Sequence, residues 1–248
     1  MDYNSDCIEL YIDSFPASYY RLSLAVRPNV PTPKRQHEAV EVINRLGALH
    51  QHYSYDDMEI DLHFNYLEEV LDFKSFKQQM SNVRHWLHNG TRLELSDEPE
   101  IYYIMKHVEI SDIVNDIIEY GEFTAKVTLA PFGRVHEDAP LTLTADSSKH
   151  IATYIYNDSI ENSLPLIVLN GTGDITLSIN NKTFNVKDVQ NPLYIDSQLK
   201  LVYEILNEVP KDVPQKALSF EFPELLPEIN QIEVTGATSI QIYRNMMR

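Results

Sequence analysis

The sequence is poor in cysteine and glycine and has no long apolar run. Its 248 residues include a single cysteine, Cys7, and seven glycines. One thiol cannot form an internal disulfide, and no Cys/His zinc quartet can be assembled around it. No stretch approaches the roughly 18 uncharged apolar residues of a membrane-spanning helix, and the N-terminus lacks the basic and apolar segments of a signal peptide. We therefore expect a chain that is made in a cytoplasm, needs no disulfides and does not insert into a membrane.

Basic residues are also scarce. The chain has 20 lysines and arginines against 37 aspartates and glutamates, a net charge of −17. The acidic excess is spread along the chain, with 22 acidic and 11 basic residues over 1–133 and 15 and 9 over 134–248. Stable binding to DNA or RNA requires a cationic track that contacts phosphates. This composition therefore argues against nucleic-acid binding, while 43% hydrophobic and 23% charged residues are typical of a globular protein.

Apolar and polar residues alternate along much of the chain, which predicts a mainly β fold. Segments 20–26, 60–64, 127–129 and 175–179 each keep a period of two, as half-buried strands do. The pair Asn180-Asn181 is a good two-residue hairpin turn into a strand over 183–187. Several short strands with turns between them indicate a sandwich in the second half.

One convincing α-helix is expected over about 72–89. Asp72 is a good N-cap, and the spacing of the apolar residues places one stripe on one helix face: Phe73, Phe76, Met80, Val83 and Leu87. Gly90 follows, where a left-handed C-terminal residue belongs. Trp86 lies beside the stripe and is interpreted as an aromatic anchor that packs the helix onto a sheet. Residues 111–120 could form a second, short helix.

A linker is expected near residues 131–140. The run PFGRVHEDAP concentrates proline, glycine and charge after one strand and before a new series of strands. It divides the chain into an N-terminal β domain with the helix, over 1–133, and a C-terminal β-sandwich domain, over 134–248. In the second domain, Gly171 and Gly173 are expected to flank a tight turn before a strand over 174–180.

The candidate metal ligands are two histidine pairs and one acidic run. His85 and His88 lie three apart on the predicted helix, and His50 and His52 form another pair, but neither pair brings further ligands nearby. The acidic run over 56–61 alternates with apolar residues, so we interpret it as the wet face of a strand. The chain has no G-x-S-x-G, phosphate-loop or H-E-x-x-H motif. We therefore expect no catalytic residue, cofactor or metal.

The order of landmarks in the first half resembles that of one known family. Arg27-Pro28 follows a leucine-rich strand, Gly47 and an acidic alternating strand come next, and the helix then ends at Trp86 and Leu87. Ser96-Asp97 and the closing pair Pro131-Phe132 complete the series. Together they resemble the distal tail proteins of long-tailed, non-contractile bacteriophages, in which the Pro-Phe pair marks a domain edge.

The second half resembles the galectin-like domain of the same family, and the resemblance rests on the order of a series of landmarks that includes Gly171, Gly173, Asp196, Pro223 and Asn230. It implies a homohexameric ring at the end of the tail tube of a virion. The ring would be a hub that binds the tail tube protein, a tail-tip or tail-fibre protein and the receptor-binding adsorption proteins, and that lets DNA pass. Two alternatives remain, a carbohydrate-binding module for host-surface glycans and a tail-associated glycosidase.

Overall fold

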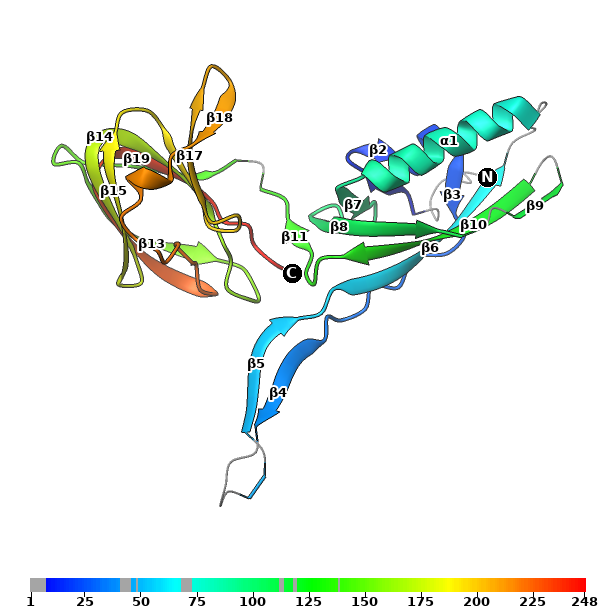
Figure 1. Cartoon of the computed structure of the whole chain (residues 1–248), viewed down its shortest axis with the longest axis horizontal. Helices are drawn as coiled ribbons and strands as arrows, with labels where there is room; N and C mark the ends of the chain where they lie inside the picture. Colours follow the sequence, from blue (N-terminus) through cyan, green and yellow to red (C-terminus); the bar gives the residue numbers. More distant parts are fainter. Residues whose placement is uncertain are drawn as a thin grey trace. The chain divides into compact units, whose positions relative to one another are not determined.

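The computed structural model describes residues 8–40, 46–47, 49–67, 73–111, 114–117, 120–137 and 139–248. The chain divides into two compact units, Met1–Arg134 (unit 1) and Val135–Arg248 (unit 2). The described part is mainly β with one α-helix, as the alternation predicted (Figure 1). That each unit folds on its own stays a prediction. No helix in the described residues is both long and apolar enough to cross a membrane.

Unit 1 is built on a curled sheet in the order β2-β1-β7-β8-β10-β6-β3, with β9 added beside β10. Its strands and its short 3-10 helix are β1 (Leu10–Ile12), β2 (Phe15–Pro16), η1 (Ala17–Tyr20), β3 (Leu22–Leu24), β4 (Arg35–Val40), β5 (Leu49–Tyr55), β6 (Met58–Leu67), β7 (Arg92–Leu95), β8 (Ile101–Ile110), β9 (Val114–Ile117) and β10 (Tyr120–Leu129). A short strand, β11 (Arg134–Val135), lies at the unit boundary. Strands β4 and β5 form a separate two-stranded sheet.

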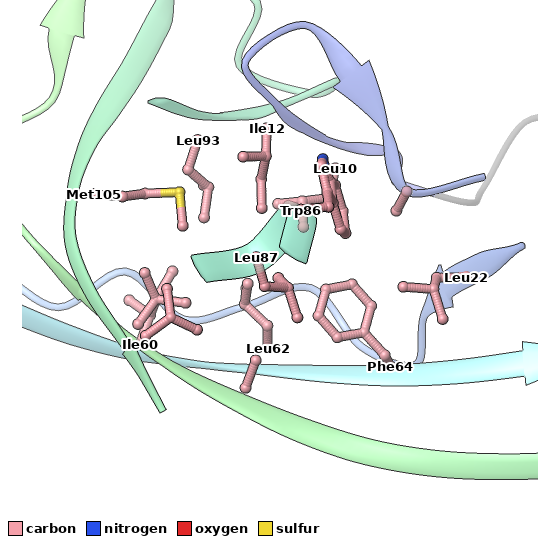
Figure 2. Close-up of a cluster of buried hydrophobic side chains, with 14 of the residues drawn as sticks. Leu10, Ile12, Leu22, Ile60, Leu62, Phe64, Trp86, Leu87, Leu93 and Met105 are labelled. Carbon is pink, nitrogen blue, oxygen red and sulfur yellow. The ribbon is translucent and has the colours of Figure 1, made fainter. Parts of the chain in front are cut away.

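The helix α1 (Phe73–Asn89) supplies much of the core of unit 1. Met80, Val83 and Leu87 are buried, as the spacing predicted, and Trp86 is 6% exposed. In Figure 2 Trp86 and Leu87 lie between residues of β1 and β7 on one side and residues of β6 on the other. The anchor interpretation of Trp86 is therefore confirmed. The predicted cap Asp72 lies outside the described residues, as do the side chains of Phe73 and Phe76 in the stripe.

Two details of the helix prediction are wrong. Gly90 does not adopt a left-handed conformation; a β-carbon there would lie 2.2 Å from Cγ2 of Ile12, so glycine is needed for close packing. The second helix over 111–120 is absent from the described residues, because Val114–Ile117 forms strand β9 and pairs with β10. Pairing with a neighbouring strand outweighed the weak local helix signal.

Unit 2 is one sheet that folds over on itself. Its strands and its short 3-10 helix are β12 (Leu141–Thr144), β13 (His150–Asn157), β14 (Leu166–Ile179), β15 (Lys182–Val189), β16 (Leu193–Asp196), β17 (Leu201–Leu206), β18 (Val209–Asp212), η2 (Pro214–Lys216) and β19 (Glu228–Tyr243). One part of β19 pairs with β13 and the other with β12, while β14 pairs with β15 through one half and with β16 through the other. The long strands β14 and β19 therefore run through both layers of the sandwich.

Glycines mark the corner where β14 and β19 bend. The register between these strands shifts on either side of Gly171, while Gly173 and Gly236 have φ values of 89° and 94°. The predicted tight turn at Gly171 and Gly173 is thus a bend inside a single strand, because pairing with β19 continues on both sides of it. Pro223 and Pro227 precede one long final strand, β19. The turn at Asn180-Asn181 is confirmed, with positive φ at both residues.

Candidate assembly surfaces

Strands β4 and β5 form a two-stranded ribbon whose β4 side chains are largely exposed. The strands pair in antiparallel fashion from Arg35 opposite Tyr55 to Val40 opposite Leu49, and Figure 1 shows them extending away from the main sheet. On β4 every residue except Gln36 is exposed, and Leu46 beyond it is fully exposed. An isolated two-stranded ribbon is only marginally stable in water. An exposed ribbon with an apolar side chain near its end is therefore suited to packing against another molecule.

Contacts at the base of the ribbon tie it to the rest of unit 1. Both Nε and Nη2 of Arg35 donate to the hydroxyl of Tyr55, at 3.0 and 2.7 Å. The Tyr55 ring meets the ring of Phe132 edge to face, with centroids 4.8 Å apart. Gln36 donates to Asp56 at 2.5 Å. Phe132, singled out in the sequence with Pro131, therefore contacts the strand that leads into the ribbon.

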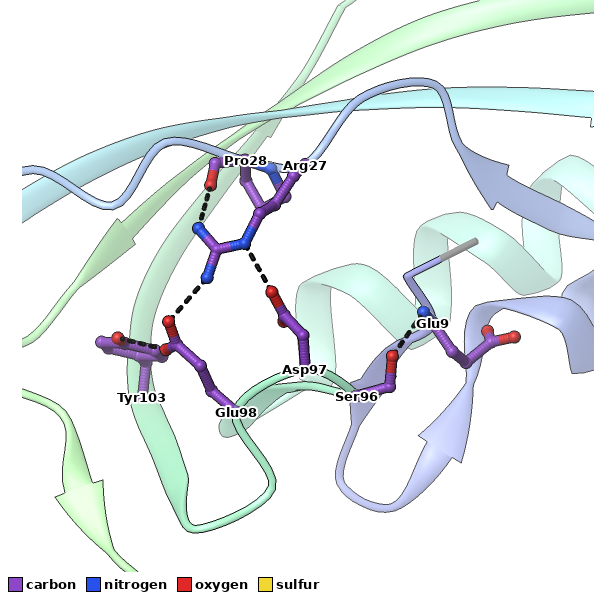
Figure 3. A network of polar contacts seen from close by, with 7 residues as sticks. All are labelled: Glu9, Arg27, Pro28, Ser96, Asp97, Glu98 and Tyr103. Carbon is purple, nitrogen blue, oxygen red and sulfur yellow. Dashed lines mark hydrogen bonds and ion pairs between the residues drawn. The ribbon is translucent and has the colours of Figure 1, made fainter. Parts of the chain in front are cut away.

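A second anchor holds the segment before the ribbon (Figure 3). Arg27 donates from Nε to Asp97 and from Nη2 to Glu98, both at 2.6 Å, and Nη1 lies 3.5 Å from the carbonyl of Pro28. Asp97 and Glu98 lie between β7 and β8, 70 and 71 residues from Arg27 in sequence. Arg27-Pro28 and Ser96-Asp97 thus come together in space. We call these contacts the Arg27 clamp.

The pKa values of Arg27 and of the neighbouring Tyr103 are both raised. The hydrogen bond to Asp97 raises the pKa of Arg27 above its ordinary value, although burial acts in the opposite direction. Burial raises the pKa of the Tyr103 hydroxyl, and the nearby Glu98 carboxylate adds to the effect. Tyr103 donates to Glu98 at 3.4 Å. The clamp therefore holds a positive arginine and a neutral tyrosine around two carboxylates.

The exposed face of β6, β10 and β8 carries four carboxylates around one lysine. Lys126 lies at its centre, 2.7 Å from Glu59, and the register places Asp61 and Glu109 beside Lys126 on the two neighbouring strands. The hydrogen bond to Glu59 raises the pKa of Lys126, and the charges of Asp61 and Glu109 act the same way. With Glu122 further along β10, the carboxylates outnumber the lysine. We call this surface the acidic face.

Three further sequence-predicted residues stabilise loops of unit 2. Asp196 accepts hydrogen bonds from the backbone of Gln198 and Leu199, at 2.9 and 2.8 Å, and so shapes the turn after β16. Asn230 is fully buried, and its amide both donates to and accepts from the backbone of Leu226 at 2.8 Å. Pro223 is buried beside a groove of about 250 Å³. These residues hold the fold and are not brought together in one site.

The remaining candidates are not assembled into a site. Gly47 has a φ of 85° and open space where a side chain would be, as befits a turn residue. His85 contacts Asn89 on the same helix at 3.1 Å. In the part of the chain that the structure describes, no three His, Cys, Asp or Glu side chains are placed to hold a metal ion. The side chains of His50 and His52 are outside the described residues.

Sequence reasoning missed the ribbon and the pairing within the Arg27 clamp. Five of the six residues of β4 are exposed, so its sequence shows no alternation that would reveal a strand. The sequence did contain a signal for the Arg27 clamp: an arginine beside a proline, and two adjacent carboxylates at a turn. The arginine and the carboxylates have opposite charges, but they lie about 70 residues apart in sequence.

Comparisons of sequence find no relative for this chain: no family model and no curated protein matches it. Comparison of structures does find matches, and they cover both units.

The Dit protein of phage SPP1, described as a paradigm of the hub adsorption apparatus in phages that infect Gram-positive bacteria, matches with a TM-score of 0.69 at 12% identity. The match covers 95% of this chain and 97% of the Dit chain. A chain of the phage p2 baseplate, in its activated conformation with strontium, matches with a TM-score of 0.54 at 10% identity over 98% of this chain and 97% of its own. The calcium form of that baseplate matches equally well, over 95% of this chain. The chain therefore has the fold of these phage hub and baseplate proteins.

Proposed function

We propose that this chain is a structural protein of a bacteriophage tail, a distal tail protein that forms the hub between the tail tube and the tail tip. The observation that carries the proposal is the fold match to the SPP1 Dit protein over 95% of this chain and 97% of that one. Similarity over the full length of both chains supports a shared architectural role better than similarity of one unit would. The hub assigned here binds other virion proteins and turns over no substrate.

Ring formation is the next part of the proposal. A closed ring needs two different, complementary patches on each copy, and a hub around a tail tube is such a ring. The ribbon supplies one patch, because five of the six residues of β4 and Leu46 beyond it are exposed. The contact between Tyr55 and Phe132 holds the base of the ribbon, and the Arg27 clamp holds the segment before it. We propose that each ribbon packs on the neighbouring copy and that six copies close the ring.

The mass of the purified full-length protein in solution tests ring formation. We expect native mass spectrometry and negative-stain images to show a sixfold ring, and the variant Leu46→Glu to shift the protein to monomers. A matched control is Phe220→Glu, because Phe220 is 99% exposed but belongs to unit 2 and not to the ribbon. A wild-type chain that stays monomeric at about 100 µM, or a Leu46→Glu chain that still assembles, would contradict the role of the ribbon.

The acidic face suggests which part of the ring DNA would meet. Phosphates pass without sticking along a surface that repels them, and the carboxylates around Lys126 supply that repulsion. We propose that the acidic face of unit 1 lines the channel. The assembled ring should not bind duplex DNA even at 50 mM salt, whereas replacing Glu59, Asp61 and Glu122 with lysine should create salt-sensitive binding. If the wild-type ring binds DNA with a steep salt dependence, the acidic face does not line the channel.

A further inference from the structure

The edges of the unit 2 sheet differ in how they are protected. An unpaired strand edge can recruit a strand of another chain, so proteins usually shorten, charge, cover or interrupt such edges. Strand β12 is only four residues long, and β18 carries Pro210 and Lys211. The edge of β15 is covered by the segment after η2, where Leu218 donates to the carbonyl of Asn185 and Ala217 forms a bridge with Val186.

Among the described residues, strand β13 has none of these protections over its central residues. It pairs only with β19 among the described residues, and it runs for eight residues, HIATYIYN, in an unbroken register. It contains no proline and no lysine, arginine, aspartate or glutamate. A long edge strand without charge or proline is the kind that adds a further strand.

The backbone of β13 shows which groups point away from β19. At one end His150 donates to the Asp146 carboxylate and accepts from the Asp146 N–H; at the other end Arg244 donates to the carbonyl of Tyr156 at 3.1 Å. These contacts lie off the ladder with β19. Because outward-facing backbone groups recur at every second residue of an antiparallel strand, the N–H and C=O groups of Ala152 and Tyr154 also face outward. The edge is closed at both ends and open at its centre.

Apolar side chains lie along the open part of this edge. Tyr154 is 69% exposed and Tyr156 57%, and both lie on the same face of β13 because they are two residues apart. Ile229, directly opposite Tyr156 on β19, is 66% exposed. These three side chains form one exposed apolar row, in which Tyr154 and Tyr156 on β13 would pack against the side chains of an added strand.

We propose that the outer edge of β13 binds an extended segment of another polypeptide, which adds to the sheet beside Ala152 and Tyr154. Glu233 lies opposite Ala152 on β19, and each chain carries a net charge of −17. Both facts favour a neutral or basic partner with alternating apolar residues. The site lies wholly within unit 2 and does not depend on ring formation.

The test uses the full-length chain and a fluorescein-labelled peptide, acetyl-Lys-Val-Thr-Val-Tyr-Val-Thr-Lys-amide, in an anisotropy titration. We expect binding, together with slower hydrogen exchange over residues 150–157 when the peptide is present. Ala152→Pro removes an outward N–H without removing a bond to β19, and Tyr154→Lys adds a charge to the edge. Each should weaken binding by at least about tenfold. Tyr19→Lys is the matched control, because Tyr19 is 70% exposed but lies in unit 1.

Each alternative occupant gives a result that overturns the proposal. Slow hydrogen exchange at the outward N–H groups of Ala152 and Tyr154 in the free chain shows an edge that is already covered. Dimerisation of the wild type that Tyr154→Lys abolishes assigns the edge to a second copy. If N-acetylglucosamine oligomers bind at Tyr154 and Tyr156 while the peptide does not bind, the apolar row is a sugar-binding surface. Equal peptide affinity of Tyr154→Lys and wild type, with both chains folded by circular dichroism, places any binding elsewhere.

Discussion

Units 1 and 2 bury the inner faces of their sheets in different ways. Unit 1 covers its sheet with α1, and a few large side chains from that helix fill the space between strands. Unit 2 has no α-helix among its described residues; it covers its sheet with itself, because β14 and β19 bend at a glycine corner and run through both layers. The stability of unit 1 should therefore depend on individual core side chains, and that of unit 2 on backbone geometry at the corner.

The largest expected effect in testing this comparison comes from separating the two units. We propose that each unit folds alone, so limited proteolysis should cut first near Arg134, in the expected linker, and release two resistant fragments. Mass spectrometry identifies the cut sites. Cuts scattered through both units, with none near residues 131–140, would contradict independent folding.

Trp86→Ala should lower the unfolding free energy of unit 1 by about 3 to 5 kcal/mol, because it removes a buried indole. That indole stacks on the Tyr20 ring, with ring centroids 4.7 Å apart, and packs edge to face against Phe64. Urea denaturation followed by circular dichroism should show the unit 1 transition at lower urea and the unit 2 transition unchanged. Tyr19→Ala, at an exposed position, is the control. Equal shifts of both transitions would mean that the units do not unfold separately.

Gly236→Ala should destabilise unit 2 by about 2 to 3 kcal/mol, through positive φ and the clash of a new β-carbon. That carbon would lie 2.4 Å from the carbonyl oxygen of Asp174 across the corner. Gly173→Ala is matched in φ but has open space around it, so it should cost only about 1 kcal/mol. Similar losses in the two variants would show that close approach at the corner is unimportant.

Arg27→Met should cost unit 1 at most about 1 kcal/mol, because the ion pairs of the Arg27 clamp are more than a third exposed. Its main effect should be local. We expect faster hydrogen exchange over residues 25–40, which comprise the segment before the ribbon and strand β4. Arg27→Lys keeps the positive charge but loses the planar set of N–H donors. Its hydrogen exchange over these residues should therefore lie between that of Arg27→Met and that of the wild type. If hydrogen exchange over residues 25–40 is unchanged in Arg27→Met, the Arg27 clamp does not stabilise the ribbon.

The smallest expected effect is the response to alkali. Burial raises the pKa of Tyr66 and Tyr103 in unit 1 and of Tyr203 in unit 2 above the ordinary value of 10.0. A raised pKa in the folded state gives stability that is complete below pH 10 and is lost as the pH rises through the folded pKa. The unit 1 urea midpoint should therefore fall more than that of unit 2 between pH 9 and pH 11. Tyr103→Phe should reduce this difference.

Elements with a buried face could be predicted from the sequence, and elements whose form depends on distant partners could not. Residues 60–64 and 175–179 alternate because one side of each strand is buried, and α1 was visible for the corresponding reason. At Gly171 and Gly173 the local signal fits either a turn or a bend, and pairing with β19, more than 50 residues away, decides between them. The candidate surfaces were hidden because exposed residues such as Leu46 and Tyr154 carry no burial pattern.

The position of β19 at the centre of the unit 2 sheet also determines the order in which that unit can fold. β19 pairs with β12, β13 and β14, and all three precede it in the chain. During synthesis these strands therefore emerge before the strand that joins them, and β12 must wait for a partner almost 100 residues further on. Unit 1 contains all the strands of its own sheet core by Leu129 and can fold while unit 2 is still being made. We expect unit 2 to fold late and in a single cooperative step.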